Sequence, residues 1–317
     1  MQQHAAFHIT CADGHLMPVY SWLPAGDIKA VLHITHGMAE YGLRYAPTAI
    51  LLAEKGFAVY ANDHRGHGPE VAPANVQQGN LGKLGLTGDN WFYKQIDDLR
   101  LVIQHHKNTH PGKKILLMGH SMGSFLSQRY FQLHGSTIDG LILSATNGQP
   151  DPLLPFGIMV AWLQMKIQGK NHRSHLIDKL SFQQFNKSFA PNRTDHDWLS
   201  RDENAVDKYL ADPLCGYVCS ASFFYYFFKG ISHTLNKKNI QFIPKNIPVY
   251  AFAGDRDPVG LRGKGFLQLI AKWKAAGVQD ISYNLYKNGR HEMLNDINRQ
   301  EVLDNLLTWI YKQEIHL

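Results

Sequence analysis

The sequence is poor in three features that define whole classes of protein: cysteine, charge and long apolar runs. Three cysteines occur in 317 residues, at Cys11, Cys215 and Cys219. This small odd number argues against a disulfide framework and is typical of a reducing compartment. Cys215 and Cys219 have no matching ligands nearby in the sequence, so we expect no zinc site and no other metal. Charged residues make up only 18%, and no block of Lys or Arg favours nucleic-acid binding.

Membrane-spanning and secretory segments are not visible either. The longest apolar runs, at 156–165 and 218–228, extend over only about ten residues, which is too short to cross a bilayer. The first residues, MQQHAAFHIT, lack a basic start followed by an apolar stretch, so we expect no signal peptide. The formal charge of +6 is a mild excess of positive charge, which slightly favours binding to anionic surfaces or phosphate-bearing substrates. The sequence predicts a cytoplasmic protein and leaves open a peripheral membrane contact and the oligomeric state.

What is present is ample material for a core, arranged in an alternating pattern. Apolar residues make up 44% and aromatic residues 11%, which excludes a disordered chain. Short apolar runs alternate with amphipathic stretches, which predicts an α/β fold with a mostly parallel sheet flanked by helices. Eight strands are predicted, at 6–10, 19–22, 30–35, 57–62, 115–119, 140–144, 249–253 and 281–286; the first two form a hairpin around Asp13-Gly14. Helices are predicted at 90–110, 122–134, 264–276 and 299–315.

One long interval interrupts this alternation. Residues 147–248 show no clear strand but contain several prolines, amphipathic pieces and the run SFFYYFF. A structureless loop of this length is implausible in a compact domain. We therefore expect a helical cap, or lid, inserted after the sixth strand, at 147–248, with residues 1–146 and 249–317 forming the core domain. The alternative is that the aromatic stripes of this interval are ordinary core.

The sequence GHSMG at 119–123 matches the pattern G-x-S-x-G, with Ser121 at its centre. A buried strand, ILLMG, precedes the serine and a helical stretch, MGSFLSQRYFQLH, follows it. A sharp strand-to-helix turn lifts a serine hydroxyl out of the sheet, and the close approach of strand and helix requires tiny residues two before and two after it. We therefore predict that Ser121 is a catalytic nucleophile.

Two backbone N–H groups are candidates for an oxyanion hole. One belongs to Met122, which directly follows the nucleophile at the N-terminus of a helix, where N–H groups are free. The other belongs to Met38, in the loop that follows the strand VLHIT. Only the backbone acts in such a site, so methionine is acceptable at both positions. We expect His36 to hold this loop by hydrogen bonds rather than to catalyse.

A serine hydroxyl needs a base, and the base needs an orienting carboxylate. His291 follows the last predicted strand, and Asp255 and Asp257 follow the strand before it. The carboxyl ends of parallel strands meet at one edge of the sheet, so all three lie on the side of Ser121. We predict His291 as the base. The residues alone leave both Asp257 and Asp255 open as the acid.

Taken together, these motifs resemble the α/β-hydrolase fold, and within it the monoacylglycerol lipase and lysophospholipase branch, which is serine aminopeptidase-like. The similarity extends over almost the whole chain. The matching segments are HGMAEYGLRY at 36–45, NDHRGHG at 62–68, GHSMG at 119–123, GDRDPV at 254–259 and RHEMLND at 290–296. In the acid loop of this branch the catalytic Asp stands three residues after the Gly, which implies Asp257. The segment 198–220 resembles the cap of bacterial lysophospholipases in the branch.

This resemblance implies a serine carboxylic-ester hydrolase that cleaves single-chain lipids, either lysophospholipids or monoacylglycerols, through an acyl-serine intermediate and without a cofactor. We expect apolar cap side chains to receive the acyl chain, namely Phe156, Met159, Trp162, Phe223 and Phe224. One alternative is an esterase, thioesterase or aminopeptidase-like hydrolase acting on small soluble substrates, because the same triad serves all of these. Others are a catalytically silent hydrolase fold that binds lipid, and a membrane-surface adaptor, which would not explain the serine motif.

Overall fold

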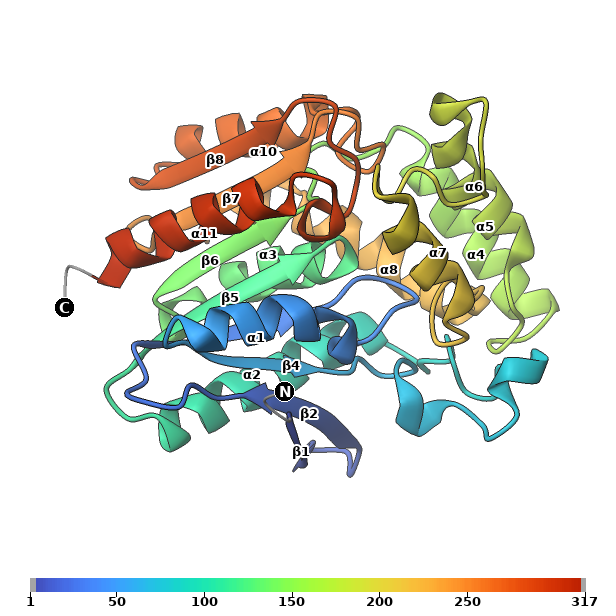
Figure 1. Cartoon of the computed structure of the whole chain (residues 1–317). Coiled ribbons are helices and arrows are strands. Elements are labelled where there is room, and N and C mark those ends of the chain that lie inside the picture. Colours follow the sequence, from blue (N-terminus) through green and yellow to red (C-terminus); the bar gives the residue numbers. More distant parts are fainter. Residues whose placement is uncertain (1–3, 315–317) are drawn as a thin grey trace.

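An eight-stranded sheet forms the centre of the computed structural model, which describes residues 4–314 (Figure 1). Its strands are β1 (Ala5–Thr10), β2 (Leu16–Trp22), β3 (Ala30–Thr35), β4 (Ala58–Asn62), β5 (Lys114–His120), β6 (Gly140–Ser144), β7 (Val249–Gly254) and β8 (Ile281–Tyr286). The strand order is β1-β2-β4-β3-β5-β6-β7-β8. β2 runs antiparallel to both of its neighbours, β1 and β4, and all other neighbouring strands are parallel. The predicted mostly parallel eight-stranded sheet is confirmed.

Helices cover both faces of this sheet. On one face lie α1 (Ala46–Glu54) and α11 (Arg299–Glu314), and on the other lie α2 (Trp91–Thr109), α3 (Met122–His134) and α10 (Lys264–Ala275) (Figure 1). The four predicted helices are observed within one or two residues of their expected bounds, although position 315 lies outside the described residues. The sequence prediction missed α1, because its segment APTAILLAE is almost uniformly apolar and shows no stripe at helical spacing.

The chain between β6 and β7 is helical in the described residues. It forms α4 (Leu154–Ile167), α5 (His175–Leu180), α6 (Phe182–Phe185), α7 (Glu203–Ala211), α8 (Ala221–Thr234) and α9 (Lys237–Ile240). Figure 1 shows α4 to α7 grouped beyond the carboxyl ends of the parallel strands. The division of the chain into a core at 1–146 and 249–317 and a separate cap at 147–248 stays a prediction. Within residues 4–314, no helix has both the length and the apolar character needed to cross a bilayer.

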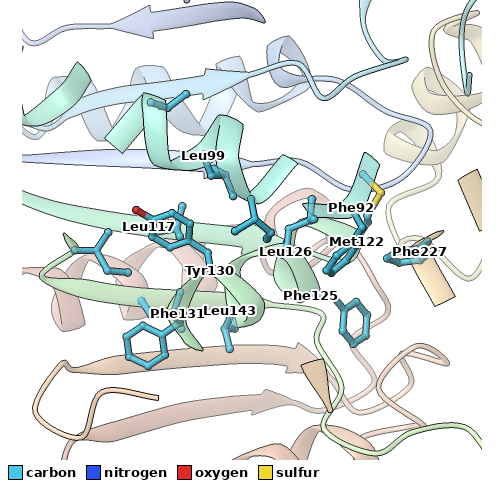
Figure 2. Packing of buried hydrophobic residues seen from close by; sticks show 14 of the residues in the cluster. Phe92, Leu99, Leu117, Met122, Phe125, Leu126, Tyr130, Phe131, Leu143 and Phe227 are labelled. Carbon is cyan, nitrogen blue, oxygen red and sulfur yellow. The ribbon is translucent and has the colours of Figure 1, made fainter. Parts of the chain in front are cut away.

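A continuous apolar core joins the helix α3 to the sheet, to α2 and to the helices between β6 and β7. Figure 2 shows side chains from these four parts of the chain meeting around α3. The labelled residues are Phe92 and Leu99 of α2, Leu117 of β5, Leu143 of β6, Phe227 of α8, and Met122, Phe125, Leu126, Tyr130 and Phe131 of α3. Because α3 packs against the sheet, α2 and α8, its N-terminus, directly after Ser121, has a defined position.

Candidate active site

Ser121 occupies the turn between β5 and α3 in a strained conformation. Its φ of 51° and ψ of −117° lie in a region that side-chain-bearing residues rarely adopt. A Cβ atom on Gly119 would lie 2.4 Å from the carbonyl oxygen of Gly123, and a Cβ atom on Gly123 would lie 2.0 Å from that of Thr35. Both positions therefore require glycine, as the motif predicts, and the turn directs Ser121 toward the carboxyl edge of the sheet.

Asp257 and His291 follow β7 and β8 and form a buried pair. The Nδ1 atom of His291 lies 2.9 Å from Oδ1 of Asp257, and the two residues are 3% and 0% exposed. Burial alone would lower the pKa of His291, but the Asp257 carboxylate and its hydrogen bond outweigh burial, so this pKa is raised above its ordinary value. The pairing leaves Nε2 as the ring nitrogen available to a neighbouring hydroxyl.

Asp255, the alternative acid, has a different function in the structure. Its Oδ1 atom accepts the backbone N–H of Asn288 at 2.7 Å, which ties the loop after β7 to the turn after β8. Asn288 itself has a φ of 58°, a conformation that asparagine tolerates in tight turns. The structure thus pairs Asp257 with His291 and uses Asp255 to hold the adjoining turn.

Ser121 and His291 line the same pocket, which has a volume of about 50 Å³. The other lining residues are Gly37, Met38, Ala39, Glu40, His120, Asp178, His196, Trp198, Leu199, Tyr209, Gly216, Tyr217 and Glu292. Met38 is therefore at the pocket wall, as expected for an oxyanion donor. Met122 begins α3, so its N–H belongs to the first helical turn, where these groups have no partner within the helix.

His36 and His120 flank the pocket without taking the position of the base. The Nε2 atom of His36 accepts the backbone N–H of His64 at 3.0 Å, so its Nδ1 carries the proton and donates to the carbonyl of Gly37 at 2.7 Å. His36 therefore holds the loop before Met38, as predicted. His120 hydrogen-bonds to the hydroxyl of Ser144 at 3.1 Å, and burial lowers its pKa to about 3.

The motif at 36–45 contains a buried ionic network whose function sequence reasoning did not assign. Glu40 accepts hydrogen bonds from the backbone N–H of Gly37 and from the hydroxyl of Tyr45. Arg44 binds Glu40 and also donates two hydrogen bonds to Glu292, at 3.0 and 2.9 Å. Burial raises the pKa of Glu40 and would raise that of Glu292, but Arg44 lowers the latter to about 2. The network joins the loop of Met38 to the loop of His291, and the spacing E…R-Y was its signal in the sequence.

The five cap residues expected to hold the acyl chain do not line this pocket. Phe156, Met159 and Trp162 lie on the outer face of α4, with exposed fractions of 43–53%. Phe223 and Phe224 of α8 are fully buried, and the ring of Phe223 stacks on Trp91 at 4.5 Å. The two phenylalanines of α8 therefore belong to the core, in line with the alternative interpretation of the aromatic stripes. Their assignment to the substrate came from composition, which does not show which side of a helix faces a site.

No metal-binding residues can be named in the part of the chain that the structure describes. Between residues 4 and 314, no group of three or more His, Cys, Asp or Glu side chains is placed to hold an ion. Cys11, Cys215 and Cys219 are buried and are not joined by disulfides.

Comparisons with known proteins identify the family of this chain. Residues 26–298 match the family model described as serine aminopeptidase, S33. The monoacylglycerol lipase of Mycolicibacterium smegmatis is 25% identical, and the match covers 96% of each chain. Lysophospholipase L2 of Escherichia coli is 32% identical over 119 residues, which is 36% of this chain and 32% of that protein.

The fold is also shared with solved structures. A thermostable carboxyl esterase from Bacillus coagulans superposes with a TM-score of 0.84 and 25% identity, over 98% of both chains. The predicted resemblance to the monoacylglycerol lipase-like α/β-hydrolases is confirmed, and so is the predicted class of carboxylic-ester hydrolase. With most of its length matched by one family model, this chain belongs to the serine aminopeptidase S33 family of α/β-hydrolases.

Proposed function

We propose that the protein cleaves the ester of single-chain lipids through an acyl-enzyme on Ser121. The observation that carries this proposal is that Ser121 lines the same pocket as His291, whose imidazole is paired with the buried Asp257. His291 Nε2 takes the hydroxyl proton while Ser121 Oγ attacks the ester carbonyl. The N–H groups of Met38 and Met122 stabilise the oxyanion. His291 then protonates the leaving alcohol, and a water molecule activated by His291 releases the fatty acid.

The charges at the pocket wall favour a substrate without a phosphate. The wall includes the acidic residues Glu40, Asp178 and Glu292, whereas its described lining contains no Lys or Arg. The nearby Arg44 is bound by both glutamates. A phosphate here would approach carboxylates without a free cation, which is unfavourable in a poorly solvated site. A glycerol head group, as in a monoacylglycerol, fits better. This local pattern outweighs the slight tilt toward phosphate that the net charge of +6 suggests.

Accommodation of a long acyl chain requires movement of the cap. A volume of about 50 Å³ has room for only a few water molecules. The outer face of α4 provides the apolar surface over which a chain leaving a bilayer would pass. Its exposed side chains are Leu153, just before the helix, and Phe156, Met159, Trp162, Leu163 and Ile167. We infer that this face contacts the membrane surface transiently, because its exposed apolar side chains are stabilised when they leave water.

A substrate panel with purified protein tests the proposal. The panel compares 16-carbon and 4-carbon monoacylglycerols, the corresponding lysophosphatidylcholines and an aminoacyl amide, with Ser121→Ala as control. We expect the highest kcat/KM for the 16-carbon monoacylglycerol, and a loss of about 10⁴-fold or more in Ser121→Ala. Retention of the wild-type melting temperature would show that the variant is folded.

Each of the other outcomes would contradict one specific part of the proposal. A higher kcat/KM for lysophosphatidylcholine, the substrate class named for the Escherichia coli relative, would contradict the neutral head group. A preference for the 4-carbon ester or the amide would support the alternative of a small soluble substrate. Turnover by Ser121→Ala at the wild-type rate would overturn the mechanism.

A further inference from the structure

A segment of the cap is joined to the loop that carries the catalytic histidine. The backbone N–H of His291 donates to the carbonyl of Trp198 at 3.3 Å, and the N–H of Glu292 donates to the carbonyl of Leu199 at 2.7 Å. Two successive residues of one loop therefore pair with two successive residues of the other. The cap segment 197–201 thus fixes the backbone from which the imidazole projects.

Two arginines reinforce this junction from opposite sides. Arg290, in the histidine loop, donates to the backbone carbonyls of Asp197 and Ser200 in the cap. Arg201, in the cap, donates to the fully buried carboxylate of Asp296 in the histidine loop, with 2.9 Å between Nε and Oδ1. Separation of the two loops would leave this carboxylate buried without its partner, which is strongly unfavourable.

The cap also supplies an aromatic ring that contacts the imidazole. The ring centroid of His291 lies 4.8 Å from that of Trp198 and 4.9 Å from that of His120 in the hydrolase core, and both ring pairs are tilted, at 44° and 54°. Trp198 lines the pocket and is 7% exposed. Its contact therefore restricts rotation of the imidazole.

We propose that the cap segment 197–201 is part of the catalytic apparatus and that Trp198 is a positioning residue for His291. This inference rests on the proposed function, because it requires His291 to act as the base. It also divides the cap into two parts. The opening that admits an acyl chain must leave 197–201 in place, so any moving part of the cap lies outside this segment.

Substitutions at Trp198 separate positioning from general loss of packing. The substrate is p-nitrophenyl butyrate, a soluble ester too short to require the cap surface. In Trp198→Leu we expect kcat to fall about 10- to 100-fold while KM stays within about twofold, because misplacement of a base slows chemistry more than binding. Trp198→Phe, which keeps a ring, should restore most of kcat. Trp198→Met has a longer, more adaptable side chain without a ring and replaces the leucine variant if that variant does not fold.

Trp309→Leu is the matched control. Trp309 of α11 is buried to a similar degree, 5% exposed, and stacks on Tyr250 of β7 in the core. Its replacement should lower the melting temperature but leave kcat unchanged. The charged and titratable groups that act on His291 are Asp257, His120, Glu292 and Glu40, and they are the same in every variant.

A second readout does not depend on turnover. The Nδ1 proton of His291, held against Asp257 at 2.9 Å, should give a far-downfield proton resonance in the wild type and in Trp309→Leu. We expect this resonance to disappear in Trp198→Leu as the ring rocks and water enters. An intact resonance together with wild-type kcat in Trp198→Leu would overturn the inference. A rise in KM alone would also overturn it, because it would show that Trp198 only lines the pocket. If the wild type hydrolyses no ester, the proposed function fails, whereas the resonance still decides whether Trp198 positions His291.

Discussion

Individual side chains at this site differ in how far the sequence reveals them. The glycines at 119 and 123 follow from sterics alone, because the strand-to-helix turn leaves no space for a Cβ atom. The choice between Asp255 and Asp257 does not follow from sterics alone. The two residues stand in one loop, and the geometry of the turn decides which of them reaches His291. Family resemblance indicated Asp257, and the structure pairs it with His291. The contact of Trp198 with His291 joins two segments that are far apart in the sequence. Neither segment contains a residue pattern that predicts this contact.

Asp257→Asn and Asp255→Asn form a matched pair that tests the assignment of the acid. We expect Asp257→Asn to reduce kcat about 10⁴-fold, because an amide holds His291 in the wrong tautomer and does not balance its positive charge. Asp255→Asn should change kcat by less than about threefold, because an amide oxygen still accepts the N–H of Asn288. Steady-state kinetics on p-nitrophenyl butyrate measure both. A larger loss in Asp255→Asn would show that the acid has been assigned to the wrong residue.

Among the helices and strands, short buried strands and amphipathic helices were predicted well, whereas uniformly apolar helices were not. The strands at 30–35, 140–144 and 281–286 and the helix α3 have the expected bounds. Helix α4, with the sequence LPFGIMVAWLQMKI, is apolar on nearly every side, so the sequence does not show which side faces inward. The structure packs its small residues inward: a Cβ atom on Gly157 would lie 3.2 Å from the ring of Phe228, and Ala161 is fully buried. The large side chains are consequently left outside.

The outer face of α4 should bind lipid surfaces. We expect the double variant Phe156→Ser with Leu163→Ser to bind phosphatidylcholine vesicles about tenfold more weakly than the wild type, because two partly buried apolar contacts with the bilayer are lost. Leu267→Ser on α10 is the control, since Leu267 is 41% exposed and Leu163 is 40% exposed. Cosedimentation with vesicles measures the difference. Equal binding by all three proteins would show that α4 is not part of the surface that binds lipid vesicles.

For the molecule as a whole, topology explains why the three residues of the proposed triad could be predicted from one sequence. β5, β7 and β8 are parallel to one another through β6, so residues that follow each strand reach the same edge of the sheet. This rule places Ser121, Asp257 and His291 together without any knowledge of distances. No such rule describes how an irregular helical insertion lies over that edge. The pocket volume and the junction at 197–201 therefore had to come from the structure.

Buried histidines should make the protein sensitive to acid. Six of them have a lowered pKa because burial disfavours the charged ring: His33, His36, His64, His67, His106 and His120. The pKa is lowered to about 4 in His33 and His64 and to about 3 in His67 and His120. Between these values and 6.5, the unfolded chain binds protons that the folded chain does not. The free energy of unfolding therefore decreases as the pH is lowered through this window. The decrease is up to about 1.4 kcal/mol per pH unit for each histidine.

Three groups oppose this trend. Burial raises the pKa of Asp63 to about 6 and also raises that of Glu40, and Asp257 raises the pKa of His291, so all three favour the folded chain in acid. The six histidines outnumber these three groups, and we expect the melting temperature to fall by about 10 °C or more between pH 7 and pH 5. Calorimetry over this range measures the change. A melting temperature that stays constant or rises toward pH 5 would contradict the account of the buried histidines.

Labelling with a fluorophosphonate examines whether Ser121 is the activated nucleophile. The reagent reacts with an activated serine and leaves one phosphonyl group, which peptide mass mapping assigns to a residue. We expect a single label on Ser121 in the wild type, slower labelling in Asp257→Asn and no label in Ser121→Ala. Equal labelling of Ser121→Ala, or an unlabelled wild type that still hydrolyses monoacylglycerol, would contradict the account.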